Sequence, residues 1–155
     1  MSESARRELP DLAGMERFGA DIAAALREGD VVALEGGLGA GKTTLARAII
    51  AALGYEGEVP SPTFTIIETY DAPPLRLPVV HADFYRLQDP AEIEEIGLDD
   101  YREGAALIAE WPDHAGGFTR VPACLSIRLE SPKNSEAKGR IAIVNGGPDW
   151  LGRLP

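Results

Sequence analysis

One short segment of the sequence carries the residue types that bind a polyphosphate. It fits the pattern G-x-x-x-x-G-K-[ST], with Gly36, Gly41, Lys42 and Thr43 at the fixed positions. Glycines let the backbone direct its N–H groups at phosphate oxygens, and a helix that starts here directs the positive end of its dipole at the same anion. We therefore expect Lys42 to reach the β- and γ-phosphates and the Thr43 hydroxyl to serve Mg²⁺, which prefers hard oxygen ligands.

The segments on either side of this loop support the interpretation. Four consecutive apolar residues, 31–34, predict a buried strand before the loop, and apolar residues at helical spacing follow it up to Gly54. Strand, loop and helix in this order are the context in which the pattern binds phosphate. The nucleotide is expected to contact the loop and the first turn of the helix, at Gly37, Leu38, Gly39, Ala40, Gly41, Lys42, Thr43 and Thr44.

A phosphate-binding loop needs an acidic side chain on a neighbouring strand to hold Mg²⁺ or its water ligands. Asp83 and Glu110 each end an apolar run that predicts a strand. Because open α/β sheets bind ligands at the carboxyl ends of their strands, both acids are expected to face one crevice. The alternative for each is an acidic loop residue or a helix cap.

Three other features allow more than one interpretation. The Ser-Pro-Thr-Phe run at residues 61–64 lies where many P-loop proteins sense the γ-phosphate, although a Ser-Pro turn is also common without function. His81 and His114 lack the spacing of metal ligands and are expected to be structural. Trp111 belongs either to the core or to a pocket wall.

Length and composition predict one domain over residues 1–155, with a core at about residues 11–145 and a loose tail at 146–155. No apolar run approaches membrane-spanning length and the N-terminal segment lacks a signal core, so we expect a cytoplasmic protein with no membrane contact. Cys124 is the only cysteine, which leaves it no disulfide partner in the chain. It is expected to be a small buried hydrophobe.

The formal net charge of −10 argues against a direct grip on nucleic acid, which needs clustered lysine and arginine. The chain has only three lysines, at positions 42, 133 and 138. If the protein serves RNA, we expect it to do so through partner proteins. Residues 89–103 hold seven acids and one arginine, which indicates either a solvated face or a docking surface for a basic partner.

Apolar periodicity predicts a helix over residues 11–27 with Asp11 as its cap, and a short helix over residues 89–97 that stops at Gly97. Further strands are predicted at residues 63–70, 77–82, 105–109, 125–129 and 141–144. Alternating strands and helices predict an α/β fold, with a central sheet that is mostly parallel or mixed and flanked by helices.

Four segments together resemble the TsaE (YjeE) family of P-loop ATPases. They are GGLGAGKTT from Gly36, SPTF from residue 61, HADFYRL from His81 and EWP from Glu110. Their order and spacing cover about residues 11–144. The last two segments are more specific than the phosphate-binding loop alone.

This resemblance implies a bacterial Mg²⁺-dependent ATPase, slow without its partners, that takes part in making threonylcarbamoyladenosine in tRNA. It would act with TsaD-like and TsaB-like proteins and reach tRNA only through them. By the family pattern, Lys42 and the loop amides bind the phosphates of ATP, Thr43 and Glu110 serve Mg²⁺, and Asp83 lies at the reaction centre.

The resemblance also implies a catalytic set made of Lys42, Asp83 and Thr63, with Thr63 as the switch residue, and a nucleotide contact from Arg140. Two positions depart from the family pattern. Family members usually carry Asp at the position of Gly37 and often Thr at that of Met15, which leaves the adenine pocket unassigned.

Two classes of rival function remain for such a loop, another enzyme and a non-catalytic module. A small-molecule or nucleotide kinase needs an acceptor pocket and usually an arginine-bearing lid, and no insertion here resembles one. A GTPase usually selects guanine with Asn-Lys-x-Asp, and neither Asn134 nor Asn145 is followed by lysine. The second rival is a non-catalytic module that uses ATP only to switch its partner surface, which measurement of phosphate release would distinguish.

Overall fold

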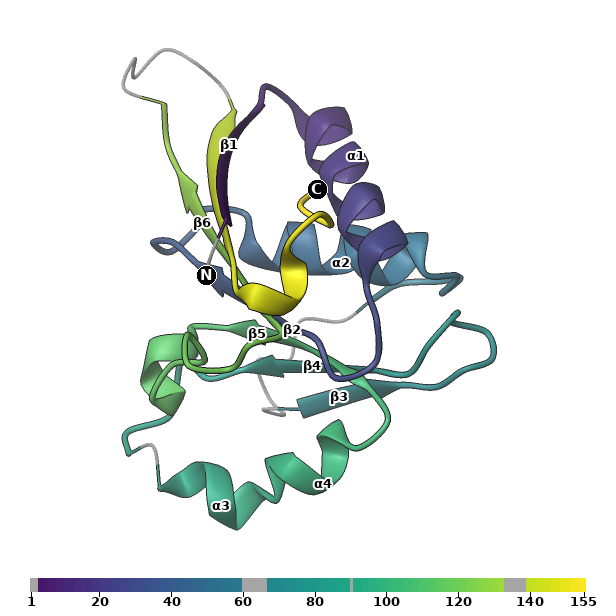
Figure 1. Cartoon of the computed structure of the whole chain (residues 1–155), viewed down its shortest axis with the longest axis vertical. Helices are drawn as coiled ribbons and strands as arrows, with labels where there is room; N and C mark the ends of the chain where they lie inside the picture. Colours follow the sequence, from purple (N-terminus) through teal and green to yellow (C-terminus); the bar gives the residue numbers. More distant parts are fainter. Residues whose placement is uncertain (1–2, 60–66, 90, 133–138) are drawn as a thin grey trace.

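Seven strands form one mixed sheet in the part of the chain that the computed structural model describes, residues 3–59, 67–89, 91–132 and 139–155 (Figure 1). Their order across the sheet is β1-β7-β6-β2-β5-β4-β3. The strands are β1 (Glu3–Leu9), β2 (Val31–Glu35), β3 (Ile67–Tyr70), β4 (Val79–Asp83), β5 (Ala106–Glu110), β6 (Cys124–Glu130) and β7 (Arg140–Gly146).

The centre of the sheet is parallel and its margins are antiparallel. β2 lies between β5 and β6 and is parallel to both, and β4 is parallel to β5. β3 pairs with β4, β7 with β6 and β1 with β7 in antiparallel fashion. The sequence predicted a sheet that is mostly parallel or mixed, and the structure shows it to be mixed. The carboxyl ends of β2, β4, β5 and β6 meet at one edge.

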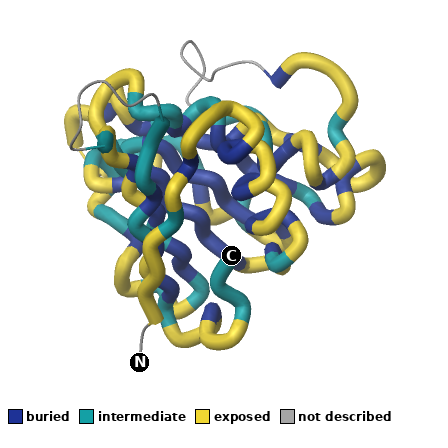
Figure 2. The backbone as a smooth tube through the Cα atoms, turned by 90° about the horizontal axis from the view of Figure 1, so that it is seen from above, coloured by how far each residue is buried: buried dark blue, intermediate teal, exposed yellow. Residues whose placement is uncertain are grey.

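Helices cover both faces of the sheet (Figure 1). On one face, α1 (Leu12–Ala25) and α2 (Lys42–Ala52) pack on Val32, Leu34 and Ile108. The opposite face buries Val31, Ala33 and Leu107 beneath α4 (Leu98–Arg102) and the partly buried side of α3 (Glu92–Ile96). Neighbouring residues of β2 thus point to opposite helical layers, as a strand requires. In Figure 2 the buried backbone lies at the centre of the molecule, and exposed loops surround it.

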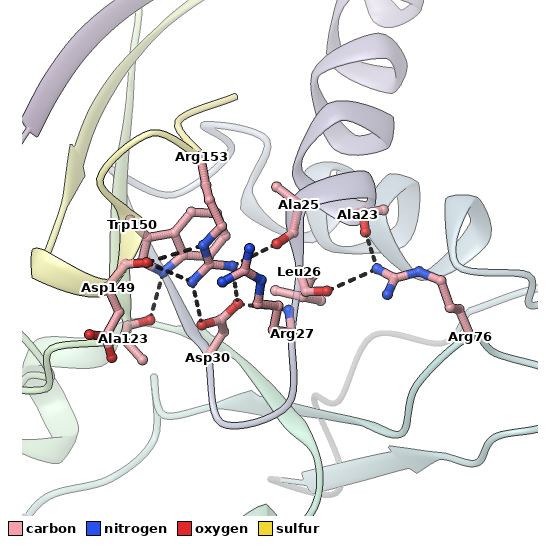
Figure 3. Close-up of polar contacts among 10 residues, drawn as sticks. All are labelled: Ala23, Ala25, Leu26, Arg27, Asp30, Arg76, Ala123, Asp149, Trp150 and Arg153. Carbon is pink, nitrogen blue, oxygen red and sulfur yellow. Dashed lines mark hydrogen bonds and ion pairs between the residues drawn. The ribbon is translucent and has the colours of Figure 1, made fainter.

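The first helix begins and ends for identifiable reasons. The Asp11 carboxylate accepts from the Gly14 N–H at 2.7 Å, so the predicted cap is confirmed. The helix ends at Ala25, two residues before the predicted end, and its free carbonyls accept from arginines distant in sequence: Arg76 donates to Ala23 and Leu26, and Arg153 to Ala25 (Figure 3). These cations lie at the negative end of the helix dipole.

Two elements were not predicted. β1 carries polar and charged residues, and Leu9 is its one buried side chain, so no apolar alternation marks this edge strand. α4 directly follows the predicted stop of α3 at Gly97, which adopts a left-handed conformation between the two short helices. The predicted strand at residues 63–70 is observed as β3 from Ile67, and residues 63–66 lie outside the described part of the chain.

The prediction of a loose C-terminal tail is wrong. After a 3₁₀ turn, η2 (Pro148–Trp150), the Trp150 ring is fully buried and its indole N–H donates to the Ala123 carbonyl at 2.7 Å. The Arg153 guanidinium lies 4.1 Å from the centre of the Trp150 ring and pairs with Asp30 at 2.9 Å (Figure 3). The misleading signal was composition, because Gly and Pro mark turns but do not prevent one tryptophan from anchoring a segment.

No helix among the described residues is long and apolar enough to cross a membrane. A second 3₁₀ turn, η1 (Pro112–Ala115), follows β5.

Candidate nucleotide-binding site

The loop between β2 and α2 takes a positive φ at three of its positions, Gly36, Gly39 and Gly41, and each favours glycine. Gly36 has φ of 143°, and a Cβ there would lie 2.7 Å from the Leu129 carbonyl oxygen. Gly41 is the left-handed residue from which α2 starts, with φ of 106°. Gly37 differs, because a Cβ there would meet no atom of the described residues within 4 Å. The Asp usual in the resembling family is therefore sterically possible at position 37.

Lys42 is folded back against its own loop. Its ammonium donates to the Gly36 and Gly37 carbonyls, at 2.8 Å each, and lies 4.1 Å from the centre of the Trp111 ring. Burial lowers the pKa of Lys42, while the negative charges of Glu110 and Asp83 oppose that shift. No carboxylate of the described residues contacts this ammonium directly, which leaves it suited to an incoming phosphate.

Glu110 is bonded through both carboxylate oxygens. Oε1 accepts from the Thr43 hydroxyl at 2.7 Å, and Oε2 lies 2.6 Å from Nε2 of His81. The three side chains come from the first turn of α2, the end of β5 and the middle of β4. Glu110 is 2% exposed and His81 is fully buried, so this chain of contacts is shielded from solvent on the side of the sheet.

Asp83 and Glu110 are direct neighbours across β4 and β5, where they form the last pair of the parallel ladder. The Asp83 carboxylate accepts from the Tyr85 N–H at 3.0 Å. Burial raises the pKa of Asp83; the Tyr85 hydrogen bond opposes the shift and the charge of Glu110 adds to it. The register thus brings together the two acids that the sequence placed at strand ends.

A pocket of about 400 Å³ joins these groups. The loop and the start of α2 form one side, and Asp83, Tyr85, Arg86, Glu110 and Trp111 form the other. Trp111 therefore belongs to the pocket wall, where its ring contacts Tyr85 with centroids 4.9 Å apart. Its backbone is left-handed, with φ of 55°, a conformation uncommon for a bulky residue and one often found at functional sites.

A second pocket of about 530 Å³ adjoins the other side of the loop. Leu9, Leu12 and Met15 give it an apolar wall, and Gly41 and Thr44 are shared with the first pocket. Arg140 also lines it, but its guanidinium is directed at the loop itself, with Nε 3.2 Å from the Ala40 carbonyl and Nη2 3.1 Å from that of Gly39. This pocket has the size and polarity of a site for a flat, mostly apolar ring system.

The hard oxygens of Thr43 and Glu110 lie side by side at the first pocket. Among the described residues, no group of three or more His, Cys, Asp or Glu side chains could hold a metal ion by itself. This donor set fits Mg²⁺, which keeps several waters and is usually held by one or two protein oxygens together with substrate phosphates.

The structure brings most of the predicted site residues to one edge of the sheet. Lys42, Thr43, Asp83 and Glu110 line the first pocket, together with Leu38, Gly39, Ala40, Gly41 and Thr44. Gly37 lies in the loop. Arg140, from β7, contacts the Gly39 and Ala40 carbonyls of the same loop. Thr63 and the rest of the 61–64 run lie outside the described residues, so their switch role stays a prediction.

Three residues of the site were missed by reasoning from the sequence. Tyr85 and Arg86 line the first pocket from the turn after β4, and His81 contacts Glu110. The signal for His81 was its spacing, since residues i and i+2 of a strand share a face and His81 stands two before Asp83. His114 matches the structural role expected of it, because its Nδ1 lies 3.1 and 2.9 Å from the Phe84 and Tyr85 carbonyls.

A phosphate-binding loop after the central strand of a parallel array, with acids at the ends of two neighbouring strands, defines an α/β protein of the P-loop nucleotide-binding class. The model of one family, described as threonylcarbamoyl adenosine biosynthesis protein TsaE, matches residues 9–140. The chain therefore belongs to the TsaE family.

Individual relatives agree with this assignment. The tRNA threonylcarbamoyladenosine biosynthesis protein TsaE of Haemophilus influenzae is 38% identical over 122 residues, which cover 75% of this chain and 76% of the relative. The protein of the same name from Mycobacterium bovis is 35% identical over 147 residues, 90% of this chain and 85% of the relative. The crystal structure of Bacillus subtilis YdiB matches with a TM-score of 0.76 at 27% identity, covering 99% of this chain and 93% of YdiB.

Proposed function

We propose that this chain binds ATP with Mg²⁺ and hydrolyses it slowly, as the ATPase component of the machinery that makes threonylcarbamoyladenosine in tRNA. Membership of the TsaE family supports the pathway. The observation that carries the activity is the convergence of Lys42, Thr43, Asp83 and Glu110 on one pocket beside the phosphate-binding loop. The same groups, supplied by a loop, a helix start and two strand ends, are those that phosphoryl transfer to water requires.

The phosphates would be held by the loop N–H groups, the N-terminal end of α2 and Lys42. The α2 dipole and the N–H groups of its first turn favour an anion at this point. Lys42 already lies at the loop with its pKa lowered by burial, so a phosphate would give the buried ammonium the direct charge partner that no carboxylate of the described residues provides. These contacts would account for binding of the nucleotide and for the position of its phosphates.

Thr43 and Glu110 would hold the metal that arrives with the nucleotide. Mg²⁺, when bound, neutralises charge on the β- and γ-phosphates. The Thr43 hydroxyl can keep donating its proton to Glu110 while its oxygen lone pairs face the pocket. Glu110 thereby fixes the direction of the Thr43 side chain.

Asp83 would act on the attacking water. In hydrolysis a bond forms from the water oxygen to the γ-phosphorus as the bond from that phosphorus to the bridging oxygen breaks and ADP leaves, and Asp83 would take the proton that the water loses. Asp83 is the pocket acid with a raised pKa, which brings it closer to the acidity of a group that accepts a proton near neutral pH. Arg86, on the turn that follows β4, adds a positive charge at the pocket where negative charge is redistributed.

The nucleoside of ATP is assigned to the second pocket, beside Leu9, Leu12 and Met15. It shares Gly41 and Thr44 with the phosphate pocket, so one ligand can occupy both. Met15 supplies a flexible apolar side chain that can adapt to a flat ring. Arg140 acts here through the loop, whose Gly39 and Ala40 carbonyls it holds.

The partners are proposed to be TsaD-like and TsaB-like proteins, with tRNA reached only through them in the cytoplasm. The net charge of −10 opposes direct contact with RNA phosphates and favours a basic protein surface. Thr63 is proposed as the residue through which the γ-phosphate alters that contact.

The test is calorimetric nucleotide binding combined with single-turnover phosphate release, with and without the partner proteins. Lys42→Ala should weaken ATP binding and abolish release, because the ammonium is the main cation inside the loop. Arg47→Ala is the matched control: it removes a cation from the same helix that contacts the Val59 carbonyl instead. Binding without any release by the native protein would support the non-catalytic switch, and unchanged binding by a folded Lys42→Ala variant would overturn the site.

A further inference from the structure

We infer that His81 is a positioning residue for the metal site: it holds the Glu110 carboxylate in the orientation that Thr43 and Mg²⁺ require. This inference rests on the proposed nucleotide site and adds to it a residue of β4 that touches neither nucleotide nor metal. The contact is direct, with His81 Nε2 2.6 Å from Glu110 Oε2, while Glu110 Oε1 accepts from Thr43.

The strand pattern explains why His81 meets Glu110. Val80 and Ala82 of β4 point into the core beneath α4, so His81 and Asp83 point to the opposite face, on which α2 lies. In the parallel ladder Asp83 pairs with Glu110 and His81 with Ile108, one pleat away from the edge. His81 therefore supports Glu110 from the buried side, and Asp83 flanks it from the pocket side.

Among the described residues, the His81 imidazole makes one hydrogen bond, to Glu110. His81 is fully buried, and its Nδ1 has no hydrogen-bond partner among the described residues. The Nε2–H tautomer suits this surrounding, because it donates to the carboxylate and leaves no N–H unpaired at Nδ1. A half-satisfied buried polar group is costly compared with an apolar side chain of similar size. The contact with Glu110 is the interaction in the structure that offsets this loss of stability.

The other histidine shows what a structural role looks like in this fold. His114 lies near the surface and contacts two backbone carbonyls, of Phe84 and Tyr85, in the turn after β4. His81 instead contacts a side chain that the metal site uses. Hydrogen-bond partners of metal-site ligands fix ligand orientation, and their loss typically lowers metal affinity or activity about 10–100-fold.

The experiment compares His81→Gln with His81→Met. The two side chains are similar in length, but only glutamine carries an N–H that can replace the Nε2–H of His81. Binding of ADP and ATP is measured by calorimetry at rising Mg²⁺ concentration and again with the metal chelated. Val80→Ala serves as the control for general destabilisation, since Val80 is buried on the opposite face of the same strand.

His81→Met should raise the Mg²⁺ concentration for half-saturation about 10–100-fold, with binding in the absence of metal unchanged. His81→Gln should recover most of the loss, and Val80→Ala should keep the native Mg²⁺ dependence. In single-turnover assays the rate should fall for His81→Met and the ATP concentration at half-maximal rate, with Mg²⁺ saturating, should not change.

Native Mg²⁺ dependence in a folded His81→Met variant, or an equal loss in the glutamine and methionine variants, would overturn the inference. These outcomes are separate from failure of the proposed function. If the native protein binds Mg²⁺ and nucleotide together but releases no phosphate, the proposed ATPase function is overturned. The role of His81 is then still decided by the binding data.

Discussion

Glu110, which ends β5, and Trp111, which follows it, contact the first two residues of α2 in reverse order. The Thr43 hydroxyl donates to Glu110 at 2.7 Å, and the Lys42 ammonium lies 4.1 Å from the ring centre of Trp111. Side chains next to each other on a strand point to opposite faces, so an extended Trp111 would turn its ring away from the loop. The left-handed backbone at Trp111 is what returns the ring to the side of Lys42. We interpret this strained residue as part of the pocket's construction.

Glu110→Gln and Asp83→Asn should separate binding from chemistry. Both acids act mainly as charge is redistributed in the transition state, so we expect each variant to lose most phosphate release, by about 10²-fold or more, while keeping appreciable nucleotide affinity. Calorimetry and single-turnover assays with partners present measure the two properties. Normal hydrolysis by both variants would mean that the metal and water are held elsewhere.

Asp83→Asn should also stabilise the protein near neutral pH. Because burial raises the pKa of Asp83, folding favours its protonated form, so the stability it contributes is present at low pH and is lost as pH rises through the raised pKa. Asparagine keeps the shape without the charge. The free energy of unfolding from urea titrations should therefore exceed that of the native protein near pH 7, with the gap closing toward about pH 4. A gap that does not depend on pH would show that the charge is not its cause.

The C-terminal clasp, in which Arg153 pairs with Asp30 and lies over the Trp150 ring, gives a stability prediction with an internal control. Asp30, 3% exposed, accepts from Arg153 and from the Arg27 N–H (Figure 3). The Arg7–Asp21 pair, by contrast, is exposed. Asp30→Ala leaves the Arg153 charge without its partner in a buried position and should cost about 3–5 kcal/mol. Asp21→Ala should cost less than about 1 kcal/mol. Equal losses in urea unfolding would mean that the clasp is no stronger than a surface ion pair.

Partner binding should depend on nucleotide, and tRNA binding should be absent for the isolated chain. The field of a net charge of −10 disfavours RNA phosphates and attracts a basic protein patch. We expect pull-downs of TsaD-like and TsaB-like proteins to differ between ATP, ADP and no nucleotide, because a ligand shifts an equilibrium only through different contacts in its two states. Tight tRNA retention in a filter assay on the chain alone, or equal pull-downs, would contradict this mechanism.

Much of the central fold could be predicted because its signals are local. The apolar runs of β2, β4 and β5 mark buried parallel strands, and the glycine pattern marks the loop between β2 and α2. The acids at positions 83 and 110 could be placed at one edge by the general rule for open sheets. That the two acids are direct neighbours follows from the register of β4 and β5, which pairs Asp83 with Glu110.

The missed features depend on contacts between segments distant in sequence. β1 is a strand because it pairs along β7, although its own residues are mostly exposed. Trp150 is buried because Ala123 offers a carbonyl and the core offers space, neither of which its glycine- and proline-rich surroundings indicate. The left-handed backbone of Trp111 is also invisible in the sequence, since this conformation is expected of glycine or asparagine.

The pairing of β1 with β7 bears on how the protein is made. The wall of the second pocket joins Leu9 and Leu12 to Arg140, and β7, which starts at Arg140, must be available before β1 has a partner. A chain emerging from the ribosome can thus form the strand–loop–helix unit of β2 and α2 early, yet it must wait for residues about 130 positions later to close the pocket beside it. Such long-range closure slows folding and leaves the N-terminal strand unpaired during synthesis. Nascent chains stalled before residue 140 should accordingly lack the second pocket, whatever the state of their phosphate-binding loop.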